Sequence, residues 1–158
     1  MIKLLKNIIF PFLKKKETEV DVRNYHETMA KSGDPAMMYM FGLNCIYGYG
    51  GKTEPERGVF WLRESAKREY HKSSFALGVL YLEGLILDSD IVESERWLLR
   101  SANAGLSDAQ YTLALEYLTG GRFAENSQDG MKWMIIAAAN GSNDAERFLD
   151  SRSGNHSE

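Results

Sequence analysis

Three equally spaced tryptophans constrain the fold of this 158-residue chain more than any other feature of its sequence. Trp61, Trp97 and Trp133 are separated by 36 residues each, and the position 36 residues before Trp61 holds another aromatic residue, Tyr25. Alanine and glycine keep the same step, at Ala30, Ala66, Ala102 and Ala138 and at Gly48, Gly84 and Gly120. A period of about 20 to 50 residues is typical of proteins built from stacked supersecondary units. The sequence therefore predicts repeats that pack on one another.

Each period contains two predicted helices. The second helix is marked by a stripe spaced i, i+3, i+4, i+7, i+8, as in Ser94, Trp97, Leu98, Ser101 and Ala102. Start signals for the helices are Asp34 before Pro35, Ser107 three residues before Gln110, Asp90 and Asn126. We expect three helix pairs over residues 34–68, 72–104 and 108–140. A lone second helix over 22–30 precedes them, and a further first helix begins at Ala145.

The third period resembles the Sel1-like repeat, a relative of the tetratricopeptide repeat. The matching residues are Ala109, Leu113, Ala114, Tyr117, Gly120, Trp133, Ala137, Ala138 and Gly141, and the resemblance extends over about residues 20–150. It implies an all-α, right-handed α-solenoid over residues 17–150, with repeats 34–69, 70–105 and 106–141 and half-repeats at each end. Family members act as adaptors for other proteins. Two departures are Cys45, where the pattern has Tyr81 and Tyr117, and Glu69 at a glycine site.

Composition narrows the class of function. The chain has 19 basic and 22 acidic residues and 44% hydrophobic residues, which is unlike a chain that coats nucleic acid. Because Cys45 is the single cysteine, no intramolecular disulfide can form, and a reducing cytoplasm is the simplest location. We therefore expect a cytoplasmic protein that does not bind nucleic acid.

The two ends of the chain differ from its body. Residues 1–16 hold five lysines and no acid, and their apolar residues follow one helical face as far as Pro11. Three interpretations stay open for this basic amphipathic arm: a helix that caps the core, a helix that lies on the surface of the inner membrane, or a loose arm. Residues 151–158 are polar and are expected to be disordered.

No pattern in the sequence indicates a catalytic, nucleotide-binding or metal-binding site. Residues 48–53 read GYGGKT, but a phosphate-binding loop requires glycine at Ile46 and a preceding strand, so a turn between helices explains them better. His26 takes a position held by apolar residues in the other repeats, and we expect it to be packed in the core. Cys45 has no basic partner in its own turn, which predicts an inert buried thiol. We expect no catalytic, metal or cofactor site, and no small-molecule substrate.

A second apolar stripe on each first helix is the most unusual feature. It lies about 200 degrees from the core stripe at 100 degrees per residue. Its outer aromatic residues, Tyr39, Phe75 and Tyr111, are expected to pack against the adjacent repeat. We expect its deeper residues to face solvent and to anchor a partner in a concave groove: Leu43, Ile46, Val79, Leu82, Leu115 and Leu118, with Tyr47, Glu83 and Asp108 at the rim.

These observations predict a non-enzymatic scaffold or adaptor that holds a partner protein or peptide. A small acidic repeat protein could instead be an immunity protein that neutralises one cognate toxin. Tight, one-to-one binding steered by charge would distinguish this alternative from an adaptor with several partners.

Overall fold

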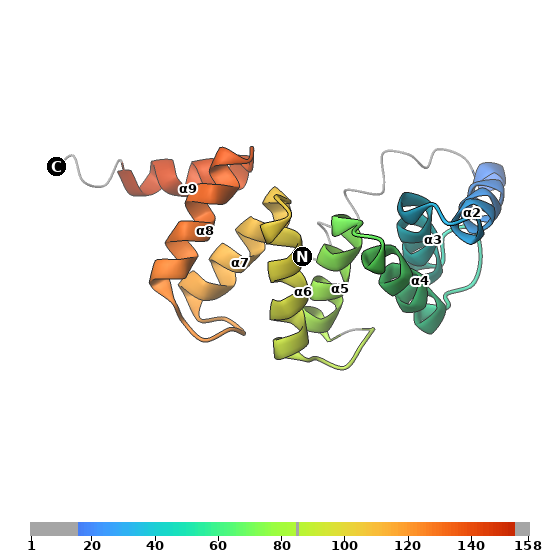
Figure 1. Ribbon diagram of the computed structural model, residues 1–158, viewed down its shortest axis with the longest axis horizontal. Coiled ribbons are helices and arrows are strands. Elements are labelled where there is room, and N and C mark those ends of the chain that lie inside the picture. Colours follow the sequence, from blue (N-terminus) through green and yellow to red (C-terminus); the bar gives the residue numbers. More distant parts are fainter. Residues whose placement is uncertain (1–15, 85, 154–158) are drawn as a thin grey trace. The chain divides into compact units, whose positions relative to one another are not determined.

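The computed structural model describes residues 16–84 and 86–153, and every regular element within these ranges is an α-helix (Figure 1). The helices are α2 (Lys16–Lys31), α3 (Pro35–Tyr47), α4 (Pro55–Lys67), α5 (His71–Glu83), α6 (Ile91–Asn103), α7 (Ser107–Thr119), α8 (Ser127–Ala139) and α9 (Asn143–Ser153). The chain divides into two compact units within α5, between Ala76 and Leu77. The predicted succession of first and second helices is confirmed.

Side-chain caps fix where several helices begin. Asp34 Oδ1 accepts hydrogen bonds from the backbone N–H groups of Ala36, at 2.8 Å, and Met37, at 3.1 Å. Asp90 and Asn126 each accept from the backbone N–H three residues later, as the sequence predicted. The Ser107 signal is wrong, because Leu106 holds the cap position of α7 and no side chain caps this helix.

The turn after each second helix contains a residue with left-handed backbone. Gly33, Gly105 and Gly141 have φ values of 104°, 92° and 85°. Glu69 takes the same place after α4 with a φ of 62°, and it is the one non-glycine residue with positive φ in the described parts of the chain. The turn geometry is therefore kept where the residue type departs from the pattern.

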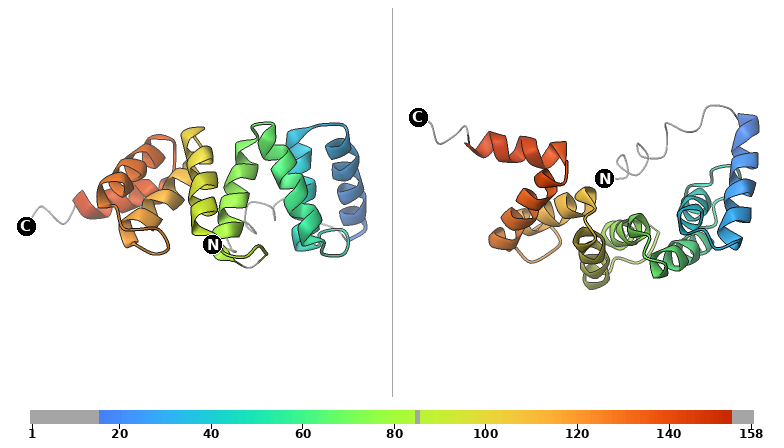
Figure 2. Two further views of the ribbon diagram at one scale, coloured as in Figure 1. Left: turned by 60° about the horizontal axis from the view of Figure 1, so that its bottom comes forward. Right: turned by 45° about the horizontal axis from the view of Figure 1, so that its top comes forward.

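Small residues let the two helices of a repeat approach closely. A Cβ atom on Gly58 of α4 would lie 2.6 Å from the carbonyl oxygen of Gly42 in α3. In the second unit, Ser94 Oγ of α6 donates to the Gly78 carbonyl of α5 at 2.9 Å. Figure 2 shows α3 beside α4 and α7 beside α8, each pair within its own unit. The helix pair is therefore the packing unit that the 36-residue period encodes.

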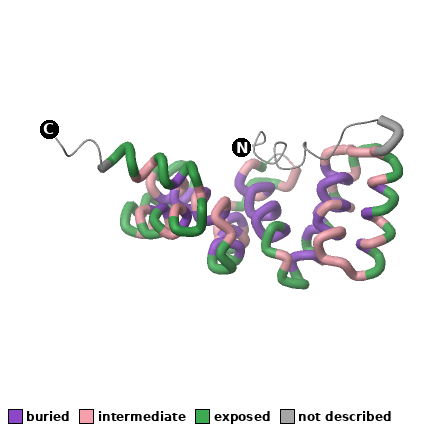
Figure 3. The backbone as a smooth tube through the Cα atoms, turned by 90° about the horizontal axis from the view of Figure 1, so that it is seen from above, coloured by how far each residue is buried: buried purple, intermediate pink, exposed green. Residues whose placement is uncertain are grey.

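Burial differs between the first and second helices (Figure 3). No residue of α3 is fully exposed, α5 exposes His71 and Lys72 at its start, and α7 exposes Thr119 at its end. In contrast, α4, α6 and α8 each carry an exposed stripe along their length. The first helices thus form the interior of the repeats.

Helix α9 continues to Ser153, so the expectation of disorder from residue 151 is wrong for residues 151–153. At the other end, the arm over residues 1–16 lies outside the described residues except for Lys16, which begins α2. Its three interpretations stay predictions.

Candidate binding surfaces

The predicted apolar groove is not exposed. Leu43 and Ile46 of α3 are 1% and 3% exposed, and Val79 and Leu82 of α5 are 2% and 0% exposed. These four side chains are core residues, so the expectation that they face solvent is wrong. Leu115 and Leu118 of α7 are half-buried and pack against the cluster that includes Ala114, Met134, Ala137 and Ala145.

The reason is that α3 and α7 each have neighbours on more than one side. In the first unit α3 contacts both α2 and α4, and in the second unit α7 contacts both α6 and α8. Two residues of the second apolar stripe lie against the second helix of their own repeat: a Cβ on Gly58 would lie 2.5 Å from Ile46 Cγ1, and one on Gly130 would lie 2.6 Å from Leu118 Cγ. Periodicity showed two stripes but could not show that both were covered.

Of the outer aromatic residues, Tyr39 and Phe75 are buried and Tyr111 packs against the cluster that includes Ala145 of α9, and the predicted rim residues are half-buried. The Tyr39 ring lies 5.5 Å from the Tyr70 ring between centroids, and Phe75 is buried. The three rim residues lie at helix ends: Tyr47 at the end of α3, Glu83 at the end of α5 and Asp108 in the first turn of α7.

A buried arginine organises the first unit. Arg23 of α2 donates to the Lys52 carbonyl at 2.9 Å and forms an ion pair with Glu54. Arg57 links the same Glu54, at 3.3 Å, to Glu27 of α2, at 2.6 Å. Its guanidinium carbon lies 4.9 Å from the centroid of the Phe41 ring. This network joins α2 to the start of α4, and its one buried charge, Arg23, could not be recognised as an interior residue from its position in the sequence.

The GYGGKT segment is the loop that receives Arg23. A Cβ on Gly50 would lie 2.2 Å from the Glu19 carbonyl oxygen, and one on Gly51 would lie 2.6 Å from Arg23 Nη1. The loop turns the carbonyl groups of Tyr49 and Lys52 toward a cation. A phosphate site needs backbone N–H donors instead, so this geometry agrees with the turn interpretation.

His26 and Cys45 are both buried, as expected. His26 Nδ1 lies 2.8 Å from Asn44 Nδ2, so this ring nitrogen is an acceptor, and burial lowers the pKa of His26. Cys45 Sγ lies 3.7 Å from Arg23 Nη2, a basic partner contributed by another helix. Burial nevertheless raises the pKa of the Cys45 thiol, which favours its unreactive protonated form.

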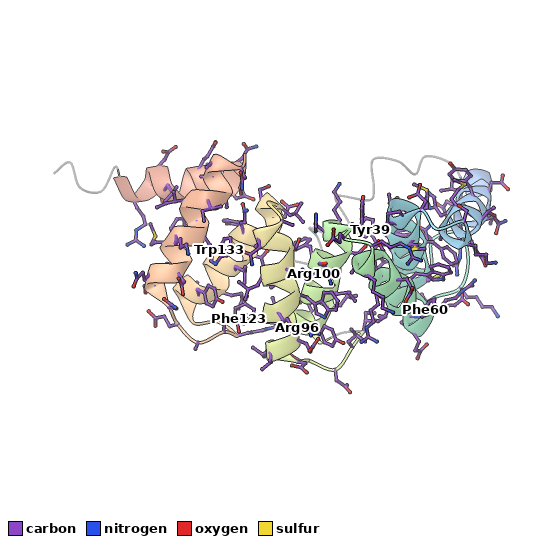
Figure 4. All side chains as sticks on the ribbon, viewed as in Figure 1. Tyr39, Phe60, Arg96, Arg100, Phe123 and Trp133 are labelled. Atoms are coloured by element: carbon purple, nitrogen blue, oxygen red, sulfur yellow. The ribbon has the colours of Figure 1, made fainter. Side chains whose placement is uncertain are left out.

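The exposed stripes of the second helices combine large apolar and charged side chains. Phe60 of α4, Val92 of α6 and Ile135 of α8 are 55%, 76% and 56% exposed. Figure 4 labels Phe60 on α4 and shows Arg96 and Arg100 on α6. The repeating positions of the second helices mark their core stripe, whereas the exposed residues vary between repeats and therefore leave no periodic signal in the sequence.

On α6 two arginines flank a tryptophan. The guanidinium carbons of Arg96 and Arg100 lie 5.4 Å and 5.6 Å from the centroid of the Trp97 ring, and the three residues line a hollow of about 160 Å³. Glu93 accepts from Arg96 at 2.6 Å and from Trp97 Nε1 at 3.1 Å. The indole is therefore held by a hydrogen bond while two cations lie close to it.

Among the described residues, no helix combines the length and the apolar character that crossing a bilayer requires. Within the same ranges, no group of three or more His, Cys, Asp and Glu side chains is arranged to hold a metal ion.

Comparison with known proteins identifies the repeats. Residues 29–70, 71–106 and 107–142 each match the Sel1 repeat. The structure is similar to that of a Sel1 repeat protein from Oxalobacter formigenes, with 22% identity and a TM-score of 0.77 over 83% of this chain and 54% of that chain. No curated protein matches the sequence.

Two other solved structures are also similar. One is c5321, a protective antigen present in uropathogenic Escherichia coli strains that displays an SLR fold, with 23% identity and a TM-score of 0.74 over 78% of this chain and 26% of that chain. The other is Helicobacter pylori cysteine rich protein B, with 16% identity and a TM-score of 0.67 over 81% of this chain and 94% of that chain. The chain thus spans about half of the first protein and a quarter of the second.

At these identities the likeness shows the fold, and it confirms the expected class, an all-α solenoid of Sel1-like helix pairs. Three consecutive matches cover residues 29–142, which is most of the sequence. The chain therefore belongs to the Sel1 repeat family.

Proposed function

We propose that this protein is a non-enzymatic scaffold that binds a partner polypeptide. Sel1 repeat proteins generally mediate protein–protein interactions. The observation that carries the proposal for this chain is the contrast between its helices. The first helices use both apolar stripes inside the repeats, whereas α4, α6 and α8 expose Phe60, Val92 and Ile135 beside charged residues.

Because of this contrast, we propose a contact surface on the second helices instead of the first helices. Leu43, Ile46, Val79 and Leu82 are too deeply buried to anchor a partner without unfolding the repeat. Exposed apolar side chains with a charged surround are typical of the centre and rim of protein interfaces. We therefore assign partner binding to the outward stripes of the second helices rather than to the first helices.

Several buried polar groups bond neighbouring helices to one another. Ser65 Oγ donates to the Pro35 carbonyl, and Ser73 Oγ donates to Ser65 Oγ at 2.7 Å. Gln110 Nε2 donates to the Ala102 carbonyl at 2.9 Å, and its Oε1 accepts from Asn140 Nδ2 at 2.9 Å. These hydrogen bonds join neighbouring helices within each unit, so these polar groups serve the packing of the repeats that would present a binding surface.

A narrower role, an immunity protein against one cognate toxin, is favoured by the acidity of the chain. Outside residues 1–16 there are 14 basic and 22 acidic residues, a balance that would steer a basic partner toward the protein. In either role we place the protein in the cytoplasm, and residues 1–16 are the candidate for contact with the inner membrane.

Cross-linking in the native cell tests the proposal. A tagged full-length chain is cross-linked, purified under denaturing conditions and compared with the tag alone. The scaffold role predicts at least one polypeptide that is captured reproducibly with the chain. Recovery of no polypeptide above the tag control would contradict protein binding.

The captured complex then separates the two roles. Titration calorimetry at low and high salt measures stoichiometry and affinity for the purified partner. One partner bound one-to-one, with affinity that falls steeply with salt, indicates the immunity role. Several partners with weaker salt dependence indicate an adaptor.

A further inference from the structure

Polar side chains hold α2 on α3. The buried residues in the described part of α2 are Arg23, His26 and Ala30, which follow one helical face at i, i+3 and i+7. At the two basic positions the later second helices have mostly apolar residues: Val59 and Leu62 in α4, Glu95 and Leu98 in α6, and Met131 and Met134 in α8. The contact between α2 and α3 therefore depends on two basic groups, an arrangement that no later second helix repeats.

Ionic contacts also join α2 to the start of α4. Glu54 pairs with Arg23 and, at 3.3 Å, with Arg57. Glu27 of α2 pairs with Arg57 at 2.6 Å and with Lys31 at 2.8 Å. Each of these two carboxylates is thus shared between two basic side chains, and a further cation in this region would find both of them occupied.

His26 is the residue of this face whose charge changes near neutral pH. Its Nδ1 accepts from Asn44 Nδ2 at 2.8 Å, and its side chain is buried. The ionisable groups on the elements around it are Arg23 and Glu27 on α2, Cys45 on α3, Glu54 in the following loop and Arg57 on α4. A proton on the ring would place a second buried cation one turn from Arg23, without a carboxylate to pair with it.

The face of α3 that α2 covers is distinct from the face that contacts α4. Toward α4, a Cβ on Gly42 would lie 2.9 Å from the Gly58 carbonyl oxygen. Toward α2, Cys45 is 0% exposed, lies 3.7 Å from Arg23 Nη2 and belongs to the cluster that includes Ala30. Departure of α2 would therefore uncover Cys45 and leave α3 packed on α4.

We infer that α2 is an acid-released helix of the first unit. It lies on α3 while His26 is neutral, and it separates from α3 when His26 takes up a proton, before the helices of the second unit unfold. Its departure uncovers an apolar face of α3 that includes Phe41 and Cys45. This conformational device goes beyond the proposed function and needs no partner.

The sign of the pH effect follows from burial. Burial lowers the pKa of His26 while α2 is in place, and the released helix holds the ring in water with its ordinary pKa of 6.5. The released form therefore binds the proton more readily than the closed form. Its fraction is expected to rise as the pH falls below about 6.5.

The reactivity of Cys45 measures this release, because it is the single cysteine of the chain. The full-length protein reacts with dipyridyl disulfide at about pH 7 and about pH 5, on either side of the ordinary histidine pKa. Each rate is divided by the rate of the urea-unfolded protein at the same pH, which gives the fraction of molecules in which Cys45 is open. We expect the open fraction to rise about fivefold or more from the higher to the lower pH.

Three variants assign the effect to its residues. His26→Gln keeps a polar side chain beside Asn44 but does not titrate, so its open fraction should change by no more than about twofold over the same range. Glu27→Gln removes the ionic contact with Arg57 and is expected to raise the open fraction about threefold or more at the higher pH. Asp144→Asn removes the acid of an ion pair within α9 and is the matched control, with an open fraction within about twofold of the wild type.

Hydrogen exchange followed by mass spectrometry on the same samples distinguishes release of α2 from unfolding of the whole chain. At the lower pH we expect amides of α2 to lose protection while those of α7 and α8 keep it. Equal open fractions at the two pH values, or an unchanged pH dependence in His26→Gln, would overturn the inference. Simultaneous loss of protection in α2, α7 and α8 would also overturn it, because Cys45 would then report global unfolding.

Discussion

Glu69 shows that backbone geometry is more regular in this chain than its residue types are. It adopts the left-handed conformation that Gly33, Gly105 and Gly141 adopt at the corresponding turns. A non-glycine residue in this conformation costs about 1 to 2 kcal/mol, because its Cβ approaches the following carbonyl oxygen. The sequence revealed the departure at Glu69, but only the dihedral angle shows that the turn did not change to accommodate it.

Glu69→Gly is expected to raise the free energy of unfolding by about 0.5 to 1 kcal/mol, since relief of backbone strain exceeds the extra entropy of glycine in the unfolded chain. Gly105→Ala is the reverse change at a site where an added Cβ meets no atom within 4 Å. It is expected to lower the free energy by about 1 kcal/mol. Urea denaturation measures both, and a destabilised Glu69→Gly variant would contradict the strain argument.

The sequence alone does not explain why Cys45 stands where the other repeats have Tyr81 and Tyr117. In the second unit, Glu95 contacts the Tyr117 hydroxyl 22 residues later, and the Tyr117 ring packs on Phe123. In the first unit, Arg23 contacts Cys45 at the same separation, and Gly51 holds the position that corresponds to Phe123. The Arg23 guanidinium group in the first unit therefore lies at the positions that the Tyr117 and Phe123 rings take in the second unit. Because three positions differ together, none of them explains the change by itself.

His26 makes stability depend on pH. Burial lowers its pKa from the ordinary value of 6.5, so the folded protein holds the neutral ring that accepts from Asn44 while the unfolded chain binds a proton more readily. Stability is therefore expected to fall as pH drops below about 6.5, toward the lower pKa of the folded state. His26→Gln should lose less stability than the wild type between about pH 7 and pH 5. Equal losses in urea denaturation would show that His26 does not contribute.

At the scale of the helices, contact within a pair depends on positions without side chains. Gly42, Gly78 and Ala114 are separated by 36 residues each, and the structure shows why two of them are glycine. Added Cβ atoms would lie 2.9 Å from the Gly58 carbonyl oxygen at Gly42 and 2.7 Å from Leu98 Cγ at Gly78. Helix existence and pairing followed from spacing and caps, whereas these distances required coordinates.

Gly58→Ala is expected to lower the free energy of unfolding by about 1 to 3 kcal/mol, because its Cβ would lie 2.6 Å from a backbone oxygen that cannot rotate away. Lys67→Ala on the exposed face of the same helix is the control and should change it by no more than about 0.5 kcal/mol. Thermal denaturation compares them. Equal stability of the two variants would mean that α3 and α4 approach less closely.

The two faces of the repeats give a second prediction at this scale. Val79→Glu places a charge at a position that is 2% exposed and should cost at least about 3 kcal/mol, because the carboxylate would be buried without a partner. Val92→Glu, on the exposed face of α6, should change stability by no more than about 0.5 kcal/mol. An unchanged melting temperature for Val79→Glu would restore the groove on the first helices.

For the whole molecule, the repeat architecture could be predicted from the sequence, but the surface proposed to bind a partner could not. A 36-residue period defines which residues are equivalent, and equivalence was enough to predict the helix pairs and the buried His26 and Cys45. It does not define which neighbour covers each face of a helix. Six of the nine residues that were predicted to bind a partner came from the second apolar stripe, and four of these six are buried. The exposed residues of the second helices vary between repeats.

The central claim is that partners bind the second helices. Hydroxyl-radical footprinting tests it most directly, with the full-length protein compared alone and in complex with the purified partner that cross-linking identifies. The account predicts that oxidation falls by about threefold or more at exposed residues such as Phe60, Val92 and Ile135. It predicts no change at Met40 and Leu115, half-buried residues of α3 and α7. Protection confined to Met40 and Leu115, with unchanged oxidation along α4, α6 and α8, would contradict the account.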